Sequence, residues 1–356
     1  MRWPDEIATP ALVVERSVLE ANLRAMAHFC QDRGLALRPH AKSHKCVEIA
    51  RRQLELGAVG ISVATVSEAE VFAAAGCADI FIAYPVLADA ARARRLRDLA
   101  ERARLIVGVD SSEGAVALGR HLRSSIPLEV MIEVECGLGR SGVPPHLARE
   151  VADTVLRSGL RIAGVFTFPG QGYAPGAAAD AADAETRALQ EAAEDLERAG
   201  IDCPVRSGGS TPTAAFTGAG ANELRPGVYA LNDAQQVALG TCEVTDVALF
   251  ALCTVVSTPT PHRLVLDGGT KVLGTDRPPY VDGHGIIVGL PGAHFARCWE
   301  HHGVVELDAS AQLWGQRLSV IPNHVCNAVN LADHLVVMED AVVVDRWSVA
   351  ARGANT

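Results

Sequence analysis

The stretch LALRPHAKSHK, residues 35–45, joins a short strand pattern to a basic segment. Leu35–Arg38 is predicted as a strand, because Gly34 ends the preceding helix and apolar residues follow it. The basic segment Arg38–Lys45 therefore lies at the carboxyl end of a strand. In a repeated strand–helix fold, that end carries the chemistry. The alternative is a basic surface loop without a function of its own.

Strand and helix patterns continue to alternate after this stretch. Seven further strands are predicted at Gly60–Val63, Asp79–Ala83, Leu105–Val109, Leu128–Val134, Ile162–Phe166, Pro204–Ser207 and Glu223–Leu224. Eight strand–helix units in about 220 residues are typical of a (β/α)8 barrel, the TIM-type α/β fold. We expect this barrel over residues 15–237.

The pattern changes after about residue 240, where short β-rich runs are split by proline and glycine and helical periodicity is lost. These runs predict a second, all-β domain over residues 238–356. The apolar strand pattern Ala11–Val14 precedes the barrel. We group residues 1–14 with the β domain, because this strand could join its sheet.

Composition narrows the class of protein. A net charge of −10 without a basic stripe argues against nucleic-acid binding. The absence of an apolar run of about 18 residues predicts no membrane span, and Met1–Glu6 lacks the apolar core of a signal peptide. Nine scattered cysteines without a Cys-x-x-Cys pair indicate reduced thiols. We therefore expect a cytoplasmic enzyme.

Lysine is rare in this chain. Of 32 lysines and arginines, only Lys42, Lys45 and Lys271 are lysines. A lysine at the carboxyl end of a barrel strand can form a Schiff base with a carbonyl cofactor. Two of the three lysines lie in the basic segment, which favours a functional interpretation of that segment.

A glycine-rich loop follows a late barrel strand. It contains Ser207, Gly208, Gly209, Ser210 and Thr211. Glycines allow close backbone approach, and successive N–H groups with nearby hydroxyls can bind a phosphate. Phosphate sites in such barrels are typical of the loops after strands 7 and 8. The alternative is a flexible turn.

A histidine and a cysteine lie two residues apart in the predicted β domain, at His324 and Cys326. In an extended segment, two such side chains face the same side. Imidazole and thiolate suit Zn²⁺, and two protein ligands fit an open catalytic site better than a structural one. The alternative is a buried histidine beside a buried cysteine.

Three further residues are candidates to contact a cofactor. Arg140 lies near the end of another barrel strand and could hydrogen-bond a cofactor oxygen. Tyr229 and Asp233 end the last barrel unit, and either could face the cofactor.

Together these motifs resemble the D-threonine aldolase and D-serine dehydratase family, which belongs to the alanine-racemase-like (fold-type III) pyridoxal-phosphate enzymes. The resemblance covers nearly the whole chain, because its motifs occur in order. They are Thr9–Val13, Arg38–Lys42, Val66–Ala69, Gly139–Val143, Ser207–Thr211, His324–Cys326 and Ala350–Gly353.

The resemblance implies a role for each candidate. Lys42 would bind pyridoxal 5'-phosphate covalently, with Lys45 as a neighbour, and Arg140 would contact the phenolic oxygen of the cofactor. The loop residues Ser207, Gly208, Gly209, Ser210 and Thr211 would hold the phosphate, Tyr229 would line the cofactor site, and His324 and Cys326 would bind a divalent metal. Zinc is favoured by the soft thiolate, with manganese or magnesium as alternatives. A homodimer is also implied.

The resemblance favours one reaction over others. The His-x-Cys pair resembles that of the dehydratases, whereas aldolases tend to carry His-x-Asp. Pro169 stands where family members usually carry a histidine, which weakens an aldolase that relies on that side chain. We therefore expect a lyase for D-β-hydroxy amino acids, a dehydratase of D-serine or 3-hydroxy-D-aspartate. The alternatives are a D-threonine-type aldolase, an amino acid racemase and a non-catalytic cofactor-binding protein.

Overall fold

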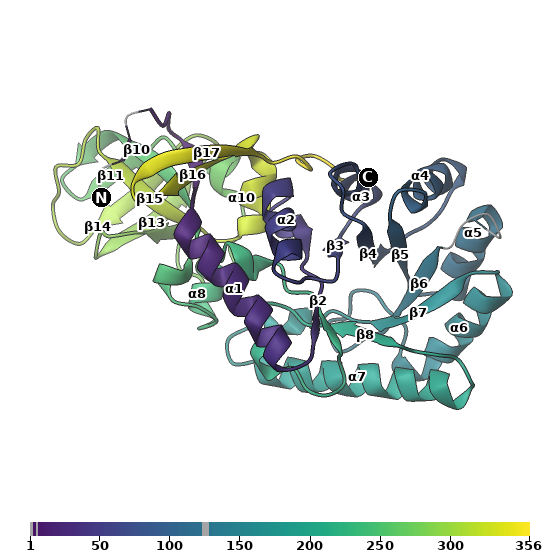
Figure 1. The fold of residues 1–356 in the computed structure, drawn as a ribbon. Coiled ribbons are helices and arrows are strands. Elements are labelled where there is room, and N and C mark those ends of the chain that lie inside the picture. The colour runs from purple at the N-terminus through teal and green to yellow at the C-terminus, as the bar shows by residue number, and fades with distance from the viewer. Residues whose placement is uncertain (1–2, 5, 123–127) are drawn as a thin grey trace. The chain divides into compact units, whose positions relative to one another are not determined.

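The computed structural model describes residues 3–4, 6–122 and 128–356, and the chain forms two compact units (Figure 1). The barrel unit consists of Met26–Lys42, Ile49–Gly227 and Ala354–Thr356. The β unit consists of Met1–Ala25, Ser43–Glu48 and Val228–Gly353. In the described ranges, no helix combines the length and the apolar character that crossing a membrane requires.

The barrel unit contains eight parallel strands, as predicted from the sequence. They are β2 (Ala36–Leu37), β3 (Ile61–Val63), β4 (Asp79–Pro85), β5 (Arg104–Val109), β6 (Glu129–Glu133), β7 (Arg161–Phe166), β8 (Val205–Gly208) and β9 (Glu223–Leu224). Their order in the sheet is β2-β9-β8-β7-β6-β5-β4-β3. The two outer strands meet through backbone hydrogen bonds from Val59 N–H to Leu37 O (2.9 Å) and from Ser62 N–H to Pro39 O (2.8 Å). The (β/α)8 prediction is confirmed.

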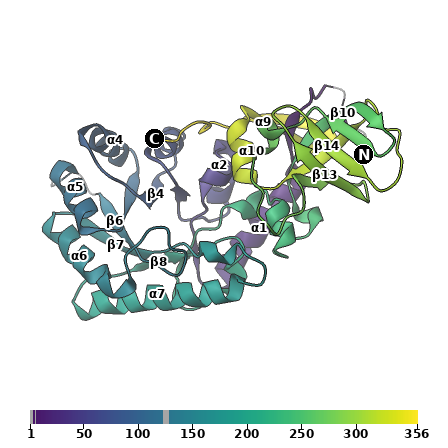
Figure 2. The ribbon, with the colours of Figure 1, turned by 180° about the vertical axis from the view of Figure 1, so that it is seen from behind.

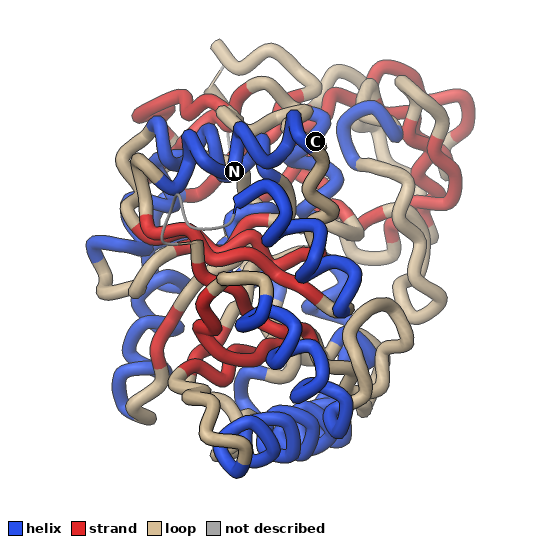
Figure 3. The backbone as a smooth tube through the Cα atoms, turned by 90° about the vertical axis from the view of Figure 1, so that its right-hand side faces the viewer, coloured by secondary structure: helices blue, strands red, loops and turns tan. Residues whose placement is uncertain are grey.

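Helices cover the outside of this sheet (Figure 2). They include α3 (Val66–Ala74), α4 (Ala90–Ala100), α5 (Ser112–Leu122), α6 (Ala148–Arg157) and α7 (Ala178–Arg198). Thr65 and Asp89 accept hydrogen bonds from backbone N–H groups in the first turns of α3 and α4, and so start those helices. The view in Figure 3 shows the same layering, with strands inside and helices around them.

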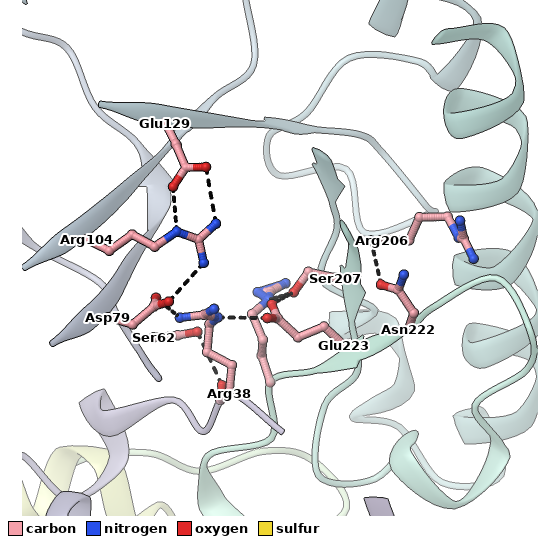
Figure 4. A network of polar contacts seen from close by, with 10 residues as sticks. Arg38, Ser62, Asp79, Arg104, Glu129, Arg206, Ser207, Asn222 and Glu223 are labelled. Atoms are coloured by element: carbon pink, nitrogen blue, oxygen red, sulfur yellow. Dashed lines mark hydrogen bonds and ion pairs between the residues drawn. The ribbon is translucent and has the colours of Figure 1, made fainter. Parts of the chain in front are cut away.

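Ion pairs are buried inside the barrel unit, and Figure 4 shows them together. The Arg38 guanidinium lies 2.5 Å from Asp79 and 2.8 Å from Glu223. Glu223 also accepts a hydrogen bond from the Ser207 hydroxyl at 2.6 Å. Toward the surface, Arg104 pairs with Asp79 at 2.9 Å. Because Arg38 and Glu223 are both buried, neither charge can replace its partner with bulk water.

Arg38→Met is expected to destabilise the protein by about 3–5 kcal/mol, because it leaves the buried Glu223 carboxylate without its cation. Arg104→Met is the matched control. The Arg104 side chain is 45% exposed, so its removal is expected to cost only about 0–1 kcal/mol. Urea unfolding of both variants measures the difference, and equal losses would contradict a special role for the buried pair.

The β unit is built on a mixed sheet of nine strands. They are β1 (Ala11–Glu15), β10 (Leu249–Thr260), β11 (Arg263–Leu266), β12 (Gly285–Ile287), β13 (Ala293–Cys298), β14 (Gly303–Leu307), β15 (Arg317–Pro322), β16 (His334–Glu339) and β17 (Val342–Ser348). The N-terminal strand β1 pairs antiparallel with β10 and parallel with β16, which gives the sheet its mixed character.

Two features of the β unit differ from the sequence-based expectation. Besides the first part of α1 (Arg16–Asp32), it contains the short helices α8 (Ala234–Ala238), α9 (Thr270–Leu273) and α10 (Val325–Leu331), so it is not built of strands alone. The division between the units also falls after Gly227, earlier than the expected boundary at residue 237. The segment from Val228 onward belongs with the β unit because the Asp233 carboxylate accepts the Val325 N–H at the start of α10 (3.0 Å).

Candidate active site

Lys42 and Arg140 approach the same aromatic ring in the barrel unit. Lys42 lies in a 3-10 turn, η1 (Ala41–Ser43), shortly after β2, and Arg140 lies in the loop after β6. The Lys42 ammonium is 5.5 Å from the centroid of the Phe168 ring, and the Arg140 guanidinium carbon is 5.1 Å from it. Phe168 itself follows β7. The carboxyl ends of three parallel strands thus bring two cations to one aromatic side chain.

The backbone after β6 is held in a tight loop by Glu135. Its carboxylate accepts N–H hydrogen bonds from Gly137 (2.5 Å), Leu138 (2.7 Å) and Gly139 (2.9 Å). Burial raises the pKa of Glu135, but these backbone donors outweigh it and the net shift is downward. These hydrogen bonds therefore fix the backbone conformation just before Arg140.

The Arg140 guanidinium lies 3.6 Å from the buried carboxylate of Glu133, the last residue of β6. Glu133 also accepts a hydrogen bond from the Ser141 hydroxyl at 2.9 Å. Burial raises the pKa of Glu133. This pairing orients Arg140 toward the same end of the barrel as Lys42.

The glycine-rich loop lies at the carboxyl end of β8, the same end of the barrel. Gly209 has a φ of +79°, a left-handed conformation that favours glycine. Two of its N–H groups have partners within the protein: that of Gly209 donates to Glu185 Oε1 (2.5 Å), and that of Ser210 donates to Thr213 Oγ1 (2.9 Å). The Ser210 and Thr211 side chains are both buried. A phosphate here would therefore rely on other donors of the loop, such as these hydroxyls.

The other two lysines belong to the β unit. Lys45 has a φ of +49°, and its ammonium donates a hydrogen bond to Asn330 Oδ1 (2.8 Å). Lys271 is exposed at the start of α9. Lys42 is thus the lysine that the barrel unit provides.

His324 and Cys326 lie together at the start of helix α10. The expectation that both lie in an extended segment is wrong: His324 is the N-cap residue, and Cys326 is already helical. Their side chains nevertheless lie close enough to interact. Burial lowers the pKa of His324, but the contact with Cys326 and the charge of Asp233 raise it to about 9.

Two residues that the sequence did not single out support His324. The Tyr280 hydroxyl donates to Gln235 Oε1 (3.0 Å), and the Gln235 amide nitrogen lies 3.0 Å from His324 Nδ1. An amide nitrogen donates, so His324 Nδ1 accepts this hydrogen bond in the structure. A metal-ligand histidine commonly donates from its second ring nitrogen, and a turned Gln235 amide would offer its oxygen as the acceptor. No local pattern could have identified Gln235, because it is 89 residues from His324 in the chain.

Asp233 is buried, and its carboxylate joins two helices. Its two carboxylate oxygens accept N–H hydrogen bonds from Gln236 (3.0 Å), in α8, and Val325 (3.0 Å), in α10. Burial raises the pKa of Asp233 to about 6. One carboxylate therefore caps two helices and places the backbone beside His324. Tyr229 is also buried in the β unit, in the 3-10 turn η5 (Val228–Ala230).

The donor sets suit the two groups that the sequence implied. A lysine and an arginine beside one aromatic ring, with a buried hydroxyl-rich loop at the same barrel end, suit a flat phosphorylated aldehyde such as pyridoxal phosphate. An imidazole in contact with a thiol suits a soft divalent metal. In the described part of the chain, no group of three or more His, Cys, Asp or Glu side chains is placed to hold a metal ion.

Pro169 is buried and precedes a 3-10 turn, η3 (Gly170–Gly172), with no ionisable side chain. Gln171 lies in this turn, and its amide nitrogen donates to Cys136 O (2.7 Å). An amide binds no proton at neutral pH, so this turn provides no base.

Comparisons with known proteins agree with this architecture. The family model of the alanine racemase N-terminal domain matches residues 14–234, and the model described as “Putative serine dehydratase domain” matches residues 248–338. D-threonine aldolase from Arthrobacter sp is 36% identical over 98% of this chain and 93% of its own. D-threo-3-hydroxyaspartate dehydratase from Delftia sp. (strain HT23) is 34% identical over 89% of this chain and 90% of its own.

The solved structure of the Delftia sp. HT23 dehydratase superimposes with a TM-score of 0.90 at 32% identity, covering 96% of this chain and 97% of that one. Two further solved structures are of D-threo-3-hydroxyaspartate dehydratase variants. One has a histidine replaced by alanine, and the other, in a metal-free form, has a cysteine replaced by alanine. The two replaced positions are two residues apart in that dehydratase.

The eight-stranded parallel barrel with a lysine after its first strand and a β-rich unit beyond it defines the alanine-racemase-like class. Within that class, the chain belongs to the D-threonine aldolase and D-serine dehydratase family of lyases.

Proposed function

We propose that this protein is a pyridoxal-phosphate- and divalent-metal-dependent dehydratase of D-β-hydroxy amino acids. Its substrate is D-serine or a 3-hydroxy-D-aspartate, and its products are a 2-oxo acid and ammonia. The proximity of the His324 and Cys326 side chains at the start of α10 is the observation that carries the proposal, because it offers an imidazole and a thiol to one divalent metal.

The barrel unit would hold the cofactor and move the first proton. The Lys42 amine would bind pyridoxal phosphate covalently, Arg140 would contact the phenolic oxygen, and Ser207–Thr211 would bind the phosphate. When bound, pyridoxal phosphate supplies an electron sink for negative charge at Cα. The Lys42 amine would also take the Cα proton of the substrate.

The β unit would act on the hydroxyl group. His324 and Cys326 would hold a divalent metal, which supplies Lewis acidity toward the β-hydroxyl. Gln235 and Tyr280 would keep the imidazole in position. Loss of the Cα proton and of the β-hydroxyl amounts to loss of water, and hydrolysis then gives the 2-oxo acid and ammonia.

One feature of the relatives and one feature of this chain support this assignment. The dehydratase variants replace a histidine and a cysteine with the same two-residue separation as His324 and Cys326, and the cysteine variant is in a metal-free form. Pro169 and its turn also provide no second base of the kind that carbon–carbon cleavage needs to take the hydroxyl proton. Zinc is the metal that we propose, because a thiolate prefers it to manganese or magnesium.

The second candidate is a D-threonine-type aldolase, which would break the Cα–Cβ bond and release glycine and an aldehyde. It is favoured by the identity of 36% with the Arthrobacter sp D-threonine aldolase over nearly the whole chain.

Product analysis separates these reactions. The purified protein with pyridoxal phosphate and zinc is incubated with D-serine, D-threonine and both 3-hydroxy-D-aspartate diastereomers, and with the L-enantiomers as controls. We expect ammonia and a 2-oxo acid from a D-substrate, abolished by a chelator and restored by zinc. Glycine with an aldehyde would establish the aldolase instead, and an inverted amino acid insensitive to chelator would establish a racemase.

A further inference from the structure

Glu185 is a buried carboxyl group on the barrel-facing side of helix α7. Buried positions on this helix recur every three or four residues, which is the pattern of an amphipathic helix. They are Ala181, Ala182, Glu185, Ala188, Leu189, Ala192, Ala193 and Leu196. Glu185 is the one acidic member of this face, and it is only 1% exposed. An acidic side chain in such a position needs a specific partner.

The partner is the backbone of the glycine-rich loop after β8. Glu185 Oε1 accepts the Gly209 N–H at 2.5 Å. A Cβ atom added to Gly208 would lie 2.2 Å from the same oxygen, so the carboxyl group packs directly against the loop. Gly209 itself needs its left-handed φ of +79° to present its N–H in this way. The carboxyl group therefore fixes the conformation of this loop from the side of helix α7.

The charge on Glu185 is poorly compensated. Its second oxygen, Oε2, is buried without a hydrogen-bond partner among the described residues. The Arg225 guanidinium acts on it by charge alone, since that group donates its hydrogen bonds to Thr167 O and to the Ser207 hydroxyl. A buried carboxylate with one backbone donor is costly compared with the neutral acid. Burial accordingly raises the pKa of Glu185 to about 7, against the lowering effects of Gly209 and Arg225.

We propose that Glu185 is a positioning residue for the cofactor phosphate. As a neutral acid, Glu185 holds the Ser207–Thr211 loop in a conformation that receives the phosphate. As a carboxylate, Glu185 repels the phosphate. This inference rests on the proposed function, because it assumes that the loop binds the phosphate of pyridoxal phosphate. It makes cofactor binding a proton-linked event in which the Glu185 carboxylate takes up one proton from solvent.

The direction of the pH effect follows from the carboxyl group. Below about pH 7 Glu185 is already neutral, so a phosphate binds without proton uptake at this residue. Above that pH the carboxylate must be protonated first, and affinity falls by at most about tenfold per pH unit. Among the groups around it, Arg225 favours the carboxylate, and the Cys136 thiol has its own pKa raised by burial and, to a smaller extent, by the Glu185 charge. Of the 3-10 turns that pack on α7, η3 and η4 (Ala214–Phe216) contain no ionisable side chain, and η2 (Pro145–Leu147) contains the exposed His146.

Calorimetric titration of the cofactor-free protein with pyridoxine 5'-phosphate tests the proposal. This probe keeps the phosphate but has no aldehyde, so the Lys42 amine does not react with it. At about pH 8 the phosphate is a dianion, because its second pKa is about 6. Repeating the titration in buffers of different ionisation enthalpy counts the protons taken up.

We expect the unaltered protein to take up close to one proton per phosphate bound at this pH. Glu185→Gln, whose amide oxygen can still accept the Gly209 N–H, is expected to take up almost none and to bind more tightly, by up to about tenfold. Glu191→Gln, on the exposed side of the same helix, is the matched control and should behave as the unaltered protein.

Equal proton uptake by the unaltered protein and Glu185→Gln would overturn the inference. If Glu185→Gln does not fold, the unaltered protein alone decides, because an absence of proton uptake at about pH 8 excludes a titrating carboxyl next to the phosphate. A failure of the proposed function looks different. Without a pyridoxal-phosphate site, the unaltered protein would bind neither pyridoxal phosphate nor pyridoxine 5'-phosphate at any pH, and a different reaction on the same cofactor would change only the products.

Discussion

Lys42→Ala protein is expected to lack the absorption band of lysine-bound pyridoxal phosphate and to lose at least about a thousandfold in turnover of D-β-hydroxy amino acids. The substitution removes both the amine that attaches the cofactor and the base that takes the Cα proton. Lys42 is the only lysine of the barrel unit, so no neighbouring amine there can replace it. Absorption spectra and steady-state rates of the purified variant measure the two effects.

Lys45→Ala is the control for this experiment, because Lys45 lies three residues away and its ammonium is bound to Asn330 at 2.8 Å. It should keep the absorption band of the attached cofactor. If Lys45→Ala loses the band and Lys42→Ala keeps it, the assignment of the cofactor lysine is wrong.

His324→Ala is expected to lose stoichiometric zinc and, with it, at least about a hundredfold in activity, because one of the two protein ligands is missing. The cofactor band of this variant should remain, since Lys42 is untouched. Metal content by mass spectrometry and absorption spectroscopy on the same sample separate the two sites. A variant with full zinc content would place the metal elsewhere.

Gln235→Leu gives a graded comparison for the same site. It keeps both ligands but removes the amide beside His324 Nδ1, so zinc affinity is expected to fall by only about 10–100-fold. An affinity equal to that of the unaltered protein would show that the Tyr280–Gln235 contact has no part in orienting the imidazole.

Local patterns were sufficient to predict the barrel. All eight strands of the barrel unit lie within a few residues of their predicted ranges, because each is a short apolar run bounded by glycine, proline or a helix pattern. The same reasoning failed at His324 and Cys326, which belong to a helix start and not to a strand. The helix there depends on the Asp233 carboxylate, which accepts the Val325 N–H from 92 residues away.

The glycine-rich loop shows the same limit. Its glycines and hydroxyls indicated a backbone suited to phosphate, but its sequence carries no sign that Glu185 already accepts the Gly209 N–H. Glu185 looks like a solvated residue of an Ala-rich helix until the packing of α7 places it against the loop. Burial and not residue type makes this carboxyl group unusual.

The sequence by itself determined the order of strands and helices, the family and the lysine of the barrel, because these depend on local periodicity and on residue types that are rare in this chain. Only the tertiary structure decided which side chains contact the candidate site residues. The contacts of Gln235 with His324 and of Glu185 with Gly209 join residues 89 and 24 positions apart. Such pairs are brought together by the packing of whole helices and strands, which no local window of sequence contains.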